Sequence, residues 1–386
     1  MDRRTFLLGA SAVSLTLATR NATAETRPQR ILILVELKGG NDGMNTLVPY
    51  ADPLYRQFRP GIGLAREHVV QLDERVGLHE KLEPLMESWK ARDLAILQGV
   101  GYPYPNRSHF RSIEIWDTAS ASSQTLSEGW ISQAFEGVVR PAGAGVDGIV
   151  VDTNSLPMVG PALRTVVMQD AENFLRQAQA MKDSSRPDSG NPALRHILDV
   201  RHEVNAAAAG LRDKLRDTPE PTTAYAQDGG FGHQLDLVTR LLTARVPVVA
   251  IKVALGGFDT HANQLPTQER LLGLLAGGLA TLRRNLIAVG RWNDVVVMTY
   301  SEFGRRARQN ASGGTDHGTS SPQFVMGGQV RGGLHGAYPS LADLQDGDLK
   351  HTIDFRSTFA EVARGCWGLQ RDFGQRQPQR LDFIAV

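Results

Sequence analysis

Carboxylates and histidines lie at the ends of several expected strands, most of them directly after a strand and one pair just before a strand. They are Asp42 in GGNDGMN, Asp259 and His261 in GGFDTHANQ, Glu302 in YSEFGRR, and Asp316 and His317 in GGTDHGTSS. Oxygen and imidazole ligands without a thiolate suit Zn²⁺, Mn²⁺ or Fe, and Mg²⁺ or Ca²⁺ where carboxylates dominate. The set is large enough to hold one or two divalent metal ions, one on either side of an ester that is hydrolysed.

The spacing within this set supports shared ligation. Asp259 and His261 are two residues apart, so in extended backbone their side chains face one side and can share an ion. Glu302 directly follows a buried strand, where an unpaired carboxylate is costly. Asp316 and His317 are adjacent, so we expect one of them to bind metal while the other orients it.

A structural alternative exists for each member. Asp42 could hydrogen-bond its own Gly-rich turn, and Asp259 could cap a helix. Glu302 could form a salt bridge with Arg305 or Arg306. The Asp-His pair before the last strand could simply be exposed on a Gly-rich loop.

Ser108 is the candidate nucleophile. It lies in YPNRSHFRSIEIW at the start of an expected helix, where backbone N–H groups and the helix dipole favour an alkoxide and an oxyanion. Arg107 and Arg111 flank it and, with Arg305, could hold an anionic group. Helix capping by Asn106 or by Ser108 itself is the alternative.

These residues require strands whose ends meet at one edge of a sheet. The runs ILILVEL at 31–37 and LAILQGVG at 94–101 are apolar on both faces, as buried parallel strands are. In the last third, helical and strand patterns alternate: helix 231–244, strand 246–255, helix 264–289, strand 294–301, strand 322–328 and helix 355–367. This pattern predicts right-handed βαβ units in a doubly wound, mostly parallel α/β sheet. Such sheets bind ligands beyond the carboxyl ends of their strands.

We expect one domain over residues 25–386. Short strands near 149–151 and 165–168 suggest a β-rich insertion. A helical insertion at about 170–229 is interrupted by loop-like stretches rich in Pro, Ser, Thr and Asp.

The first 24 residues read as a twin-arginine signal. Arg3 and Arg4 precede a short apolar run, and Ala-Thr-Ala ends at Ala24. We therefore expect export by the twin-arginine machinery to the periplasm or the cell exterior, whether or not the signal is cleaved. We expect no stable membrane span in the mature form, since no other segment looks like an apolar stretch of about 20 residues.

The composition limits the classes of ligand and partner that we expect. The formal net charge is +1 and acidic residues balance basic ones, so there is no electrostatic footprint for nucleic acid. The only cysteine, Cys366, excludes an intrachain disulfide. The expected partner is a small or polysaccharide-linked anionic ester.

The ordered motifs GGNDGMN, YPNRSHFRSIEIW, GGFDTHANQ, YSEFGRR and GGTDHGTSSPQFVMGG closely resemble those of an exported bacterial family known mainly as a domain of unknown function. The resemblance runs from about Arg30 to the end of the chain. That family is similar to a distant branch of the alkaline phosphatase and sulfatase superfamily. The resemblance implies an alkaline-phosphatase-like fold, with Asp42 as the ligand after the first strand and Ser108 as the nucleophile. It also implies a second ligand set, formed by Asp259, His261 and His317.

Three departures from that superfamily stand out. Asp259 and His261 are two residues apart, where the superfamily usually has a spacing of four. Glu302 stands where an Asp-His pair is usual, which removes one metal ligand. The segment SHFRS lacks the Pro and the following Arg of the sulfatase motif that is oxidised to formylglycine, which disfavours an ordinary sulfatase.

The sequence thus predicts an exported metal-dependent hydrolase of phosphate mono- or diesters, with sulfate esters less favoured. The alternative is a non-catalytic binding or envelope-assembly protein that keeps the fold and one metal. A metal-free serine esterase with His109 or His317 as the base lacks a G-x-S-x-G elbow.

Overall fold

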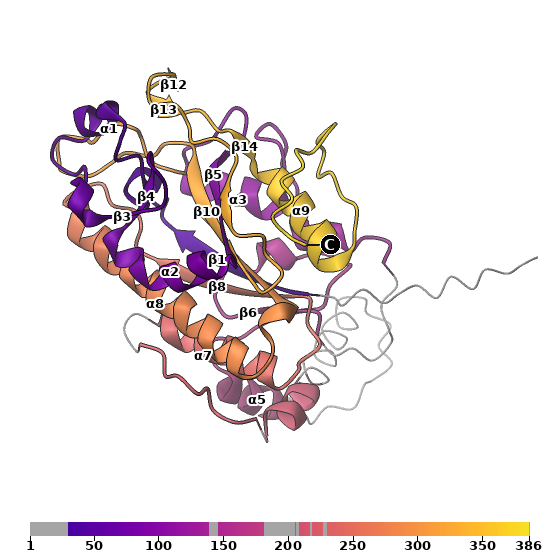
Figure 1. Ribbon diagram of the computed structural model, residues 1–386. Coiled ribbons are helices and arrows are strands. Elements are labelled where there is room, and N and C mark those ends of the chain that lie inside the picture. The colour runs from indigo at the N-terminus through magenta and orange to yellow at the C-terminus, as the bar shows by residue number, and fades with distance from the viewer. Residues whose placement is uncertain are drawn as a thin grey trace, which may run out of the picture.

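The computed structural model describes residues 30–138, 146–180, 205, 208–216, 218–226 and 230–385. Within them, nine strands form one sheet in the order β11-β5-β10-β9-β1-β8-β6-β7, with β14 beside β5 (Figure 1). The strands are β1 (Ile31–Lys38), β5 (Leu94–Gly101), β6 (Gly148–Val150), β7 (Thr165–Val167), β8 (Ala250–Gly256), β9 (Val295–Tyr300), β10 (Ser321–Met326), β11 (Gly333–His335) and β14 (Ile353–Asp354).

Helices cover both faces of this sheet. They are α1 (Pro53–Phe58), α2 (Met86–Ala91), α3 (His109–Thr118), α4 (Trp130–Ala134), α5 (Ala171–Ala180), α7 (Phe231–Thr243), α8 (Gln264–Ala288) and α9 (Phe355–Trp367). Figure 1 shows α7 and α8 on one side of the sheet and α3 and α9 on the other. Smaller strands form a three-stranded sheet, β2 (Leu47–Val48), β4 (Gly77–His79) and β3 (Val69–Gln71), and a hairpin, β12 (Leu344–Gln345) and β13 (Asp348–Leu349). The architecture is therefore a mixed, mostly parallel sheet between helical layers.

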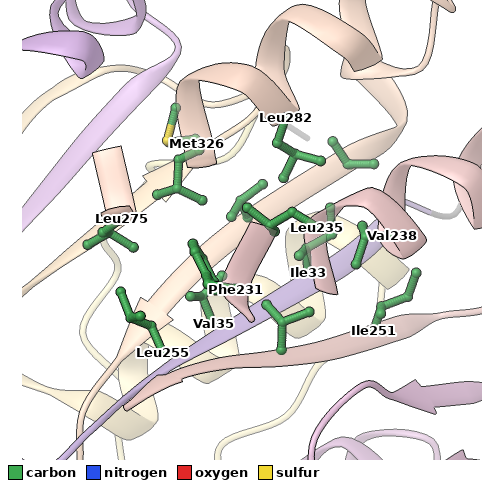
Figure 2. Close-up of a cluster of buried hydrophobic side chains, with 14 of the residues drawn as sticks. Ile33, Val35, Phe231, Leu235, Val238, Ile251, Leu255, Leu275, Leu282 and Met326 are labelled. Atoms are coloured by element: carbon green, nitrogen blue, oxygen red, sulfur yellow. The ribbon is translucent and has the colours of Figure 1, made fainter. Parts of the chain in front are cut away.

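Strand β1 forms the centre because its side chains are apolar on both faces. Ile33, Val35 and Leu37 belong to the core under α7 and α8, whereas Leu32 and Leu34 belong to the core under α3, α4 and α9. Figure 2 shows Ile33 and Val35 packed against side chains of α7, α8 and β8, among them Phe231, Leu235, Leu275, Leu282 and Ile251. The two cores fix the position of β1 and of the loop that follows it.

Three adjacent strands, β9, β1 and β8, run parallel and in register. Leu37 pairs with Leu255 of β8, and Glu36 pairs with Tyr300 of β9. Their carboxyl ends therefore lie side by side at one edge of the sheet. Gly39, Gly257 and Ser301 begin the loops at this edge.

The alternating pattern wrongly predicted parallel pairing for the strand after 294–301. Strand β10 is antiparallel to both β9 and β5. The reason is local: the described segment between β9 and β10 contains loops and a single bridge between Arg305 and His317, and no crossover helix. A chain without a crossover returns antiparallel. That return brings the loop before β10 back to the edge formed by β1, β8 and β9.

Other sequence expectations need correction. Strands β6 and β7 do not form a separate β-rich insertion, because they extend the main sheet beside β8. The helical pattern GLHEKLEPLMESWKARD predicts one helix over 77–93, but this segment divides into β4, a 3₁₀ helix at Glu80–Leu85 and α2, since Pro84 interrupts the helical hydrogen bonds. The helical insertion at about 170–229 lies largely outside the described residues, and the expected signal at 1–24 lies wholly outside them.

Helix α8 was not expected to resemble a membrane span. It is the one helix of the described chain that is long and apolar enough to cross a bilayer by length and composition. However, 61% of its most apolar window is buried inside the protein. Leu271, Leu275, Leu279 and Leu282 are almost fully buried in the core beneath it. This is the pattern of a core helix that packs on a sheet.

Candidate functional site

Loops from three parts of the chain meet at the carboxyl edge of β9, β1 and β8. Asp259 and His261 follow β8, Glu302 follows β9, and His317 lies in the loop before β10. Helix α3 adds His109 at its first turn. The sheet geometry places this meeting point where doubly wound sheets bind ligands.

Four side chains, those of His109, Asp259, His261 and His317, form the donor cluster, and the three atoms in it that could bind a metal and lie closest together form a triangle. The Nε2 atom of His261 lies 3.0 Å from Nε2 of His317 and 3.0 Å from Oδ1 of Asp259. The third side, from Nε2 of His317 to Oδ1 of Asp259, is 3.2 Å. His109 approaches from the other side, with Nε2 3.4 Å from Oδ2 of Asp259. Ligand atoms of His109, Asp259 and His317 all lie within 4.8 Å of one another.

The second ring nitrogen of His317 and that of His109 are hydrogen-bonded to the protein. Nδ1 of His317 lies 2.8 Å from the carbonyl oxygen of Arg107. A carbonyl only accepts, so Nδ1 donates and the Nε2 lone pair of a neutral ring faces the cluster. Nδ1 of His109 lies 2.8 Å from Oε1 of Glu302, which orients this ring in the same way. Nδ1 of His261 is 3.6 Å from the exposed Asp316.

Glu302 therefore contacts Nδ1 of His109, and Asp316 lies near Nδ1 of His261. The Oε1 atom of Glu302 also accepts the backbone N–H of Gly39 at 2.9 Å, and Oε2 accepts the hydroxyl of Ser301 at 3.3 Å. A buried carboxylate with these partners has little left for a direct metal bond. Oδ1 of Asp316 accepts from Asn310 at 3.1 Å. We expected Glu302 as a ligand, and one of Asp316 and His317 as a ligand with the other orienting it; the contacts of Glu302 suit it to orienting an imidazole instead.

The carboxylate of Asp259 is charged at neutral pH. Burial raises its pKa, but neighbouring charged groups, Arg305 first among them, outweigh that effect and lower the pKa to about 2. Its side chain remains 45% exposed, as does that of His261. The cluster therefore combines an ionised oxygen, converging imidazole nitrogens and access from solvent.

Arg305 holds the surrounding loops together and is fully buried. Its guanidinium donates to the carbonyl oxygens of Gly40 at 2.7 Å, Thr315 at 2.8 Å and Phe258 at 2.9 Å, and to that of Gly39. It also donates to Oδ1 of Asp259 at 2.7 Å. The expectation that Arg305 holds a substrate anion is corrected, because its donors are used inside the protein.

Two glycines allow the loops to approach closely. At Gly39, φ is +113°, and a Cβ there would overlap the backbone nitrogen of Asp259. A Cβ at Gly314 would overlap the backbone carbonyl of His261. The Gly-rich character of these motifs thus has a steric cause at the site.

Asp42 contacts other residues than those of the donor cluster. It is fully buried, and Oδ2 accepts from Arg59 at 2.5 Å and from Gln264 at 2.5 Å. Oδ1 accepts the backbone N–H of Met44 at 3.2 Å, which caps a short 3₁₀ turn at Gly43–Asn45. The sequence interpretation of Asp42 as a metal ligand does not match this position. Sequence reasoning missed Arg59, because a lone arginine in FRPG carries no motif.

Ser108 lies between two residues that touch the cluster. Arg107 contacts His317 through its carbonyl, and His109 contacts Asp259. Ser108 is exposed and its side chain makes no capping hydrogen bond. Asn106 instead accepts from the Ser108 backbone N–H at 2.8 Å. The capping alternative for the Ser108 hydroxyl is therefore not realised.

The two flanking arginines differ. Arg111 pairs with Glu114 at 2.8 Å and donates to the carbonyl oxygens of Ser122 and Gln124, so it faces away from the cluster. Arg107 pairs with the buried Asp348, yet 37% of its side chain remains exposed. Of the three arginines expected to hold an anion, Arg107 alone keeps an exposed guanidinium beside the site.

The donor set suits a divalent metal. Zinc–nitrogen and zinc–oxygen bonds of about 2.0–2.1 Å place tetrahedral ligand atoms about 3.3 Å apart, and the triangle sides are 3.0–3.2 Å. Three histidines and one carboxylate without a thiolate are compatible with Zn²⁺, Mn²⁺ or Fe, and less so with Mg²⁺ or Ca²⁺. With Asp42 and Glu302 engaged elsewhere, the described residues fit one ion better than two.

Comparison with solved structures gives distant likenesses. The periplasmic domain of EcEptC from Escherichia coli, in complex with Zn, is 9% identical, with a TM-score of 0.34 over 78% of this chain and 74% of that one. The lipoteichoic acid synthase LtaP from Listeria monocytogenes is 9% identical, with a TM-score of 0.36 over 90% and 74%. An alkaline phosphatase superfamily protein from Vibrio parahaemolyticus is 11% identical, with a TM-score of 0.35 over 81% and 64%.

Comparison by sequence gives a family. No curated protein matches the chain. One family pattern matches residues 74–365, which is more than half of the chain and contains the candidate nucleophile and every residue of the donor cluster. The chain therefore belongs to the protein family of unknown function DUF1501.

Proposed function

We propose that this protein is an exported metal-dependent hydrolase of phosphate mono- or diesters, with sulfate esters as the less favoured substrates. The observation that carries the proposal is the triangle of Asp259 Oδ1, His261 Nε2 and His317 Nε2, with sides of 3.0–3.2 Å. Lone pairs this close repel each other unless a cation or a proton lies between them. A divalent cation satisfies all of them at once.

Asp259, His261 and His317 would hold the metal, and His109 would complete the set. When bound, the ion would act as a Lewis acid toward a phosphoryl oxygen and would favour the ionised form of a nearby hydroxyl. Glu302, Arg107 and Asp316 would keep the imidazoles in the metal-binding tautomer. Such outer contacts are the expected companions of metal-binding histidines.

Ser108 would act as the nucleophile. Its Oγ would form a bond to phosphorus while the bond from phosphorus to the leaving oxygen breaks, and the seryl proton would depart with the released alcohol. Water would then cleave the seryl phosphate, returning a proton to Ser108 and releasing phosphate. The exposed position of Ser108 at the start of α3 supports this role, since the N–H groups of the first turn can stabilise developing negative charge.

Arg107 would bind the non-reacting oxygens of the ester. Its guanidinium is held by Asp348 and stays partly exposed. An arginine clamp beside the nucleophile orients a phosphate and favours attack in line. Arg111 and Arg305 have other partners, so loss of anion binding should follow substitution of Arg107 rather than of Arg111.

The test combines metal content with activity. Protein exported from its own signal is analysed for Zn, Mn, Fe, Ca and Mg, and is assayed with p-nitrophenyl phosphate, bis-p-nitrophenyl phosphate and p-nitrophenyl sulfate. We expect a near-stoichiometric metal that is lost in Asp259→Asn. Ser108→Ala should keep the metal and lose turnover by at least about 100-fold. Folded wild-type protein that binds no metal, or unchanged turnover in Ser108→Ala, would refute the proposal.

A non-catalytic binding or envelope-assembly protein is the second candidate. One observation favours it: Asp42 and Glu302 are engaged by protein donors, so the described residues offer ligands for a single ion. A retained metal without any seryl phosphate intermediate, together with co-purification of an envelope polysaccharide or protein, would select this candidate over the hydrolase.

Export by the twin-arginine pathway belongs to the same proposal. Arg3 and Arg4 support it through the sequence alone. Replacing both by lysine should retain the protein in the cytoplasm, as measured by fractionation against a protein exported in the unfolded state. Unchanged export of the double variant would reject this route.

A further inference from the structure

A pocket of about 320 Å³ lies beside the candidate active site. It forms between the loop that leads into α3 and the hairpin β12–β13. Its lining includes Tyr102, Tyr104, Arg107, Thr319, Asp348 and His351. Two of these residues connect it to the cluster: Arg107 accepts the hydrogen bond of His317, and Thr319 follows two residues after His317.

We propose that this pocket binds a neutral sugar ring of a glycan-linked substrate, next to the ester that is hydrolysed. The inference rests on the proposed function and adds to it the chemical class of the group that carries the ester. Three properties of the pocket support this assignment: its balanced charge, its unpartnered polar atoms and its exposed aromatic ring.

The charges on the pocket wall cancel. Arg107 and Lys350 are positive, while Asp346 and Asp348 are negative. Burial lowers the pKa of His351, which favours its neutral form. A second phosphate would need an excess of positive charge, and a lipid chain would need a wall without ionised groups. Closely spaced donors and acceptors with no net charge suit a ligand rich in hydroxyl groups.

The wall also carries polar atoms without partners. Arg107 donates to Oδ2 of Asp348, but Oδ1 of Asp348 and Nε of Arg107 have no hydrogen-bond partner among the described residues. The Asp348 side chain is 2% exposed. Buried polar atoms are normally satisfied, and a sugar hydroxyl that enters the pocket can donate to a carboxylate and accept from a guanidinium together.

Tyr104 supplies an aromatic surface at the pocket. Its residue is 87% exposed, and its φ of +54° is unusual for a bulky residue. Leaving a large aromatic ring in water forgoes the free energy of burial, and a strained backbone at such a position points to a functional constraint. The apolar face of a sugar ring can stack on an exposed tyrosine, and the neighbouring Pro103 and Pro105 stiffen the loop that presents it.

The sequence provides a matched control for Tyr104. Phe110 on α3 is also an exposed aromatic residue, at 89%, and it lies six positions further along the same segment. It does not line the pocket. Because both side chains project into solvent, Tyr104→Ala and Phe110→Ala should leave no cavity and both should fold like the wild type.

Binding is tested without reference to turnover. Cellotetraose, chitotetraose and maltotetraose are titrated into wild type, Tyr104→Ala, Tyr104→Trp and Phe110→Ala, and saturation-transfer NMR measures binding. We expect at least one tetrasaccharide to bind wild type, with a loss of tenfold or more in Tyr104→Ala and no change in Phe110→Ala. Tyr104→Trp should retain binding. Absence of binding for all three sugars, or equal binding by Tyr104→Ala, would overturn the assignment.

A kinetic comparison separates this inference from the hydrolase proposal. In Tyr104→Ala, kcat/KM for glucose 1-phosphate should fall about tenfold relative to wild type, while that for p-nitrophenyl phosphate stays the same. An equal fall for both esters would overturn the sugar assignment. Sugar binding that depends on Tyr104 in a protein that hydrolyses neither ester would support the pocket and refute the hydrolase.

Discussion

Replacing Asp42 by asparagine separates the role given by the structure from the role implied by the superfamily resemblance. The resemblance implies that Asp42 is a metal ligand. In the structure, Asp42 forms a fully buried ion pair with Arg59 at 2.5 Å and a hydrogen bond with Gln264. Asparagine preserves the shape of the side chain and removes the charge. We therefore expect Asp42→Asn to lose stability while it keeps the metal.

The expected loss can be worked out from the contacts of Arg59. Removing one partner of a buried ion pair costs about 3–5 kcal/mol. Arg59 keeps three other acceptors: the carbonyl oxygens of Ala307 at 3.0 Å and Arg306 at 2.9 Å, and Oδ1 of Asn45 at 2.9 Å. These place the cost near the lower end, about 3 kcal/mol. With an unfolding entropy of about 2.1 cal/mol/K per residue over 386 residues, Tm should fall by about 4 °C.

The assay uses Asp259→Asn as the matched comparison. Unfolding by urea is measured on metal-stripped protein, and zinc affinity is measured by titration calorimetry. Asp42→Asn should lose about 3 kcal/mol and bind zinc within about threefold of wild type. Asp259→Asn alters a half-exposed side chain that keeps an acceptor for Arg305, so it should lose less stability than Asp42→Asn and bind zinc far more weakly. Loss of zinc binding in Asp42→Asn without loss of stability would refute the structural role and restore Asp42 to the ligand set.

Three further predictions follow from the contacts and charges described above. Glu302→Gln keeps an acceptor for the Gly39 N–H but removes the negative charge next to His109, so zinc affinity should fall by about 10–100-fold. Asp316→Asn is the control. A larger loss of zinc affinity in Asp316→Asn, measured by calorimetry, would contradict the assignment. Burial lowers the pKa of His79 to about 4, whereas the pKa of a histidine in the unfolded chain is about 6.5. The stability that neutral His79 contributes is therefore complete above about pH 6.5, and it falls by about 3 kcal/mol as the pH drops toward 4. Urea unfolding across this range should show a flatter profile for His79→Gln, and identical profiles would contradict the prediction. Burial and the nearby Glu36 raise the pKa of Asp117 to about 7, so its contribution is full below its unfolded pKa and is lost as pH rises through about 7. Asp117→Asn should therefore gain stability relative to wild type as the pH rises from about 4 to about 7, and a constant difference would exclude the shift.

Much of the fold could be predicted because its central strands and long helices have strong patterns. ILILVEL became β1, LAILQGVG matched β5 at both ends, and helices α7, α8 and α9 lie within one residue of the expected bounds. The parallel direction of β9, β1 and β8 was predicted too, but that of β10 was not. The direction of β10 depends on whether a helix crosses back over the sheet, and the Gly-rich loop before β10 hides the absence of that helix.

The candidate site was predictable where sheet topology determines position. Asp259 and His261 follow β8, and His317 lies in the loop between β9 and β10, so all three reach the carboxyl edge of β9, β1 and β8. Their role as metal ligands stays a prediction. The partners of Asp42 and Glu302 could not be foreseen, because Arg59 stands in no motif and His109 lies 193 residues away from Glu302 in the sequence. A carboxylate at a strand end looks the same in sequence whether it faces a metal, an arginine or an imidazole.

Arg305 explains why flexible Gly-rich loops can present a fixed set of donors. One guanidinium joins the loop after β1, the loop after β8 and the loop before β10, and it also contacts Asp259 directly. A lysine has a single ammonium group and cannot reach carbonyl oxygens on three sides in one plane. The position of Asp259 and its low pKa therefore have the same cause, since the residue that fixes the loops also keeps the carboxylate ionised. Arg305→Lys should consequently weaken metal binding and the fold together, whereas substitution of an exposed histidine such as His261 should weaken metal binding alone.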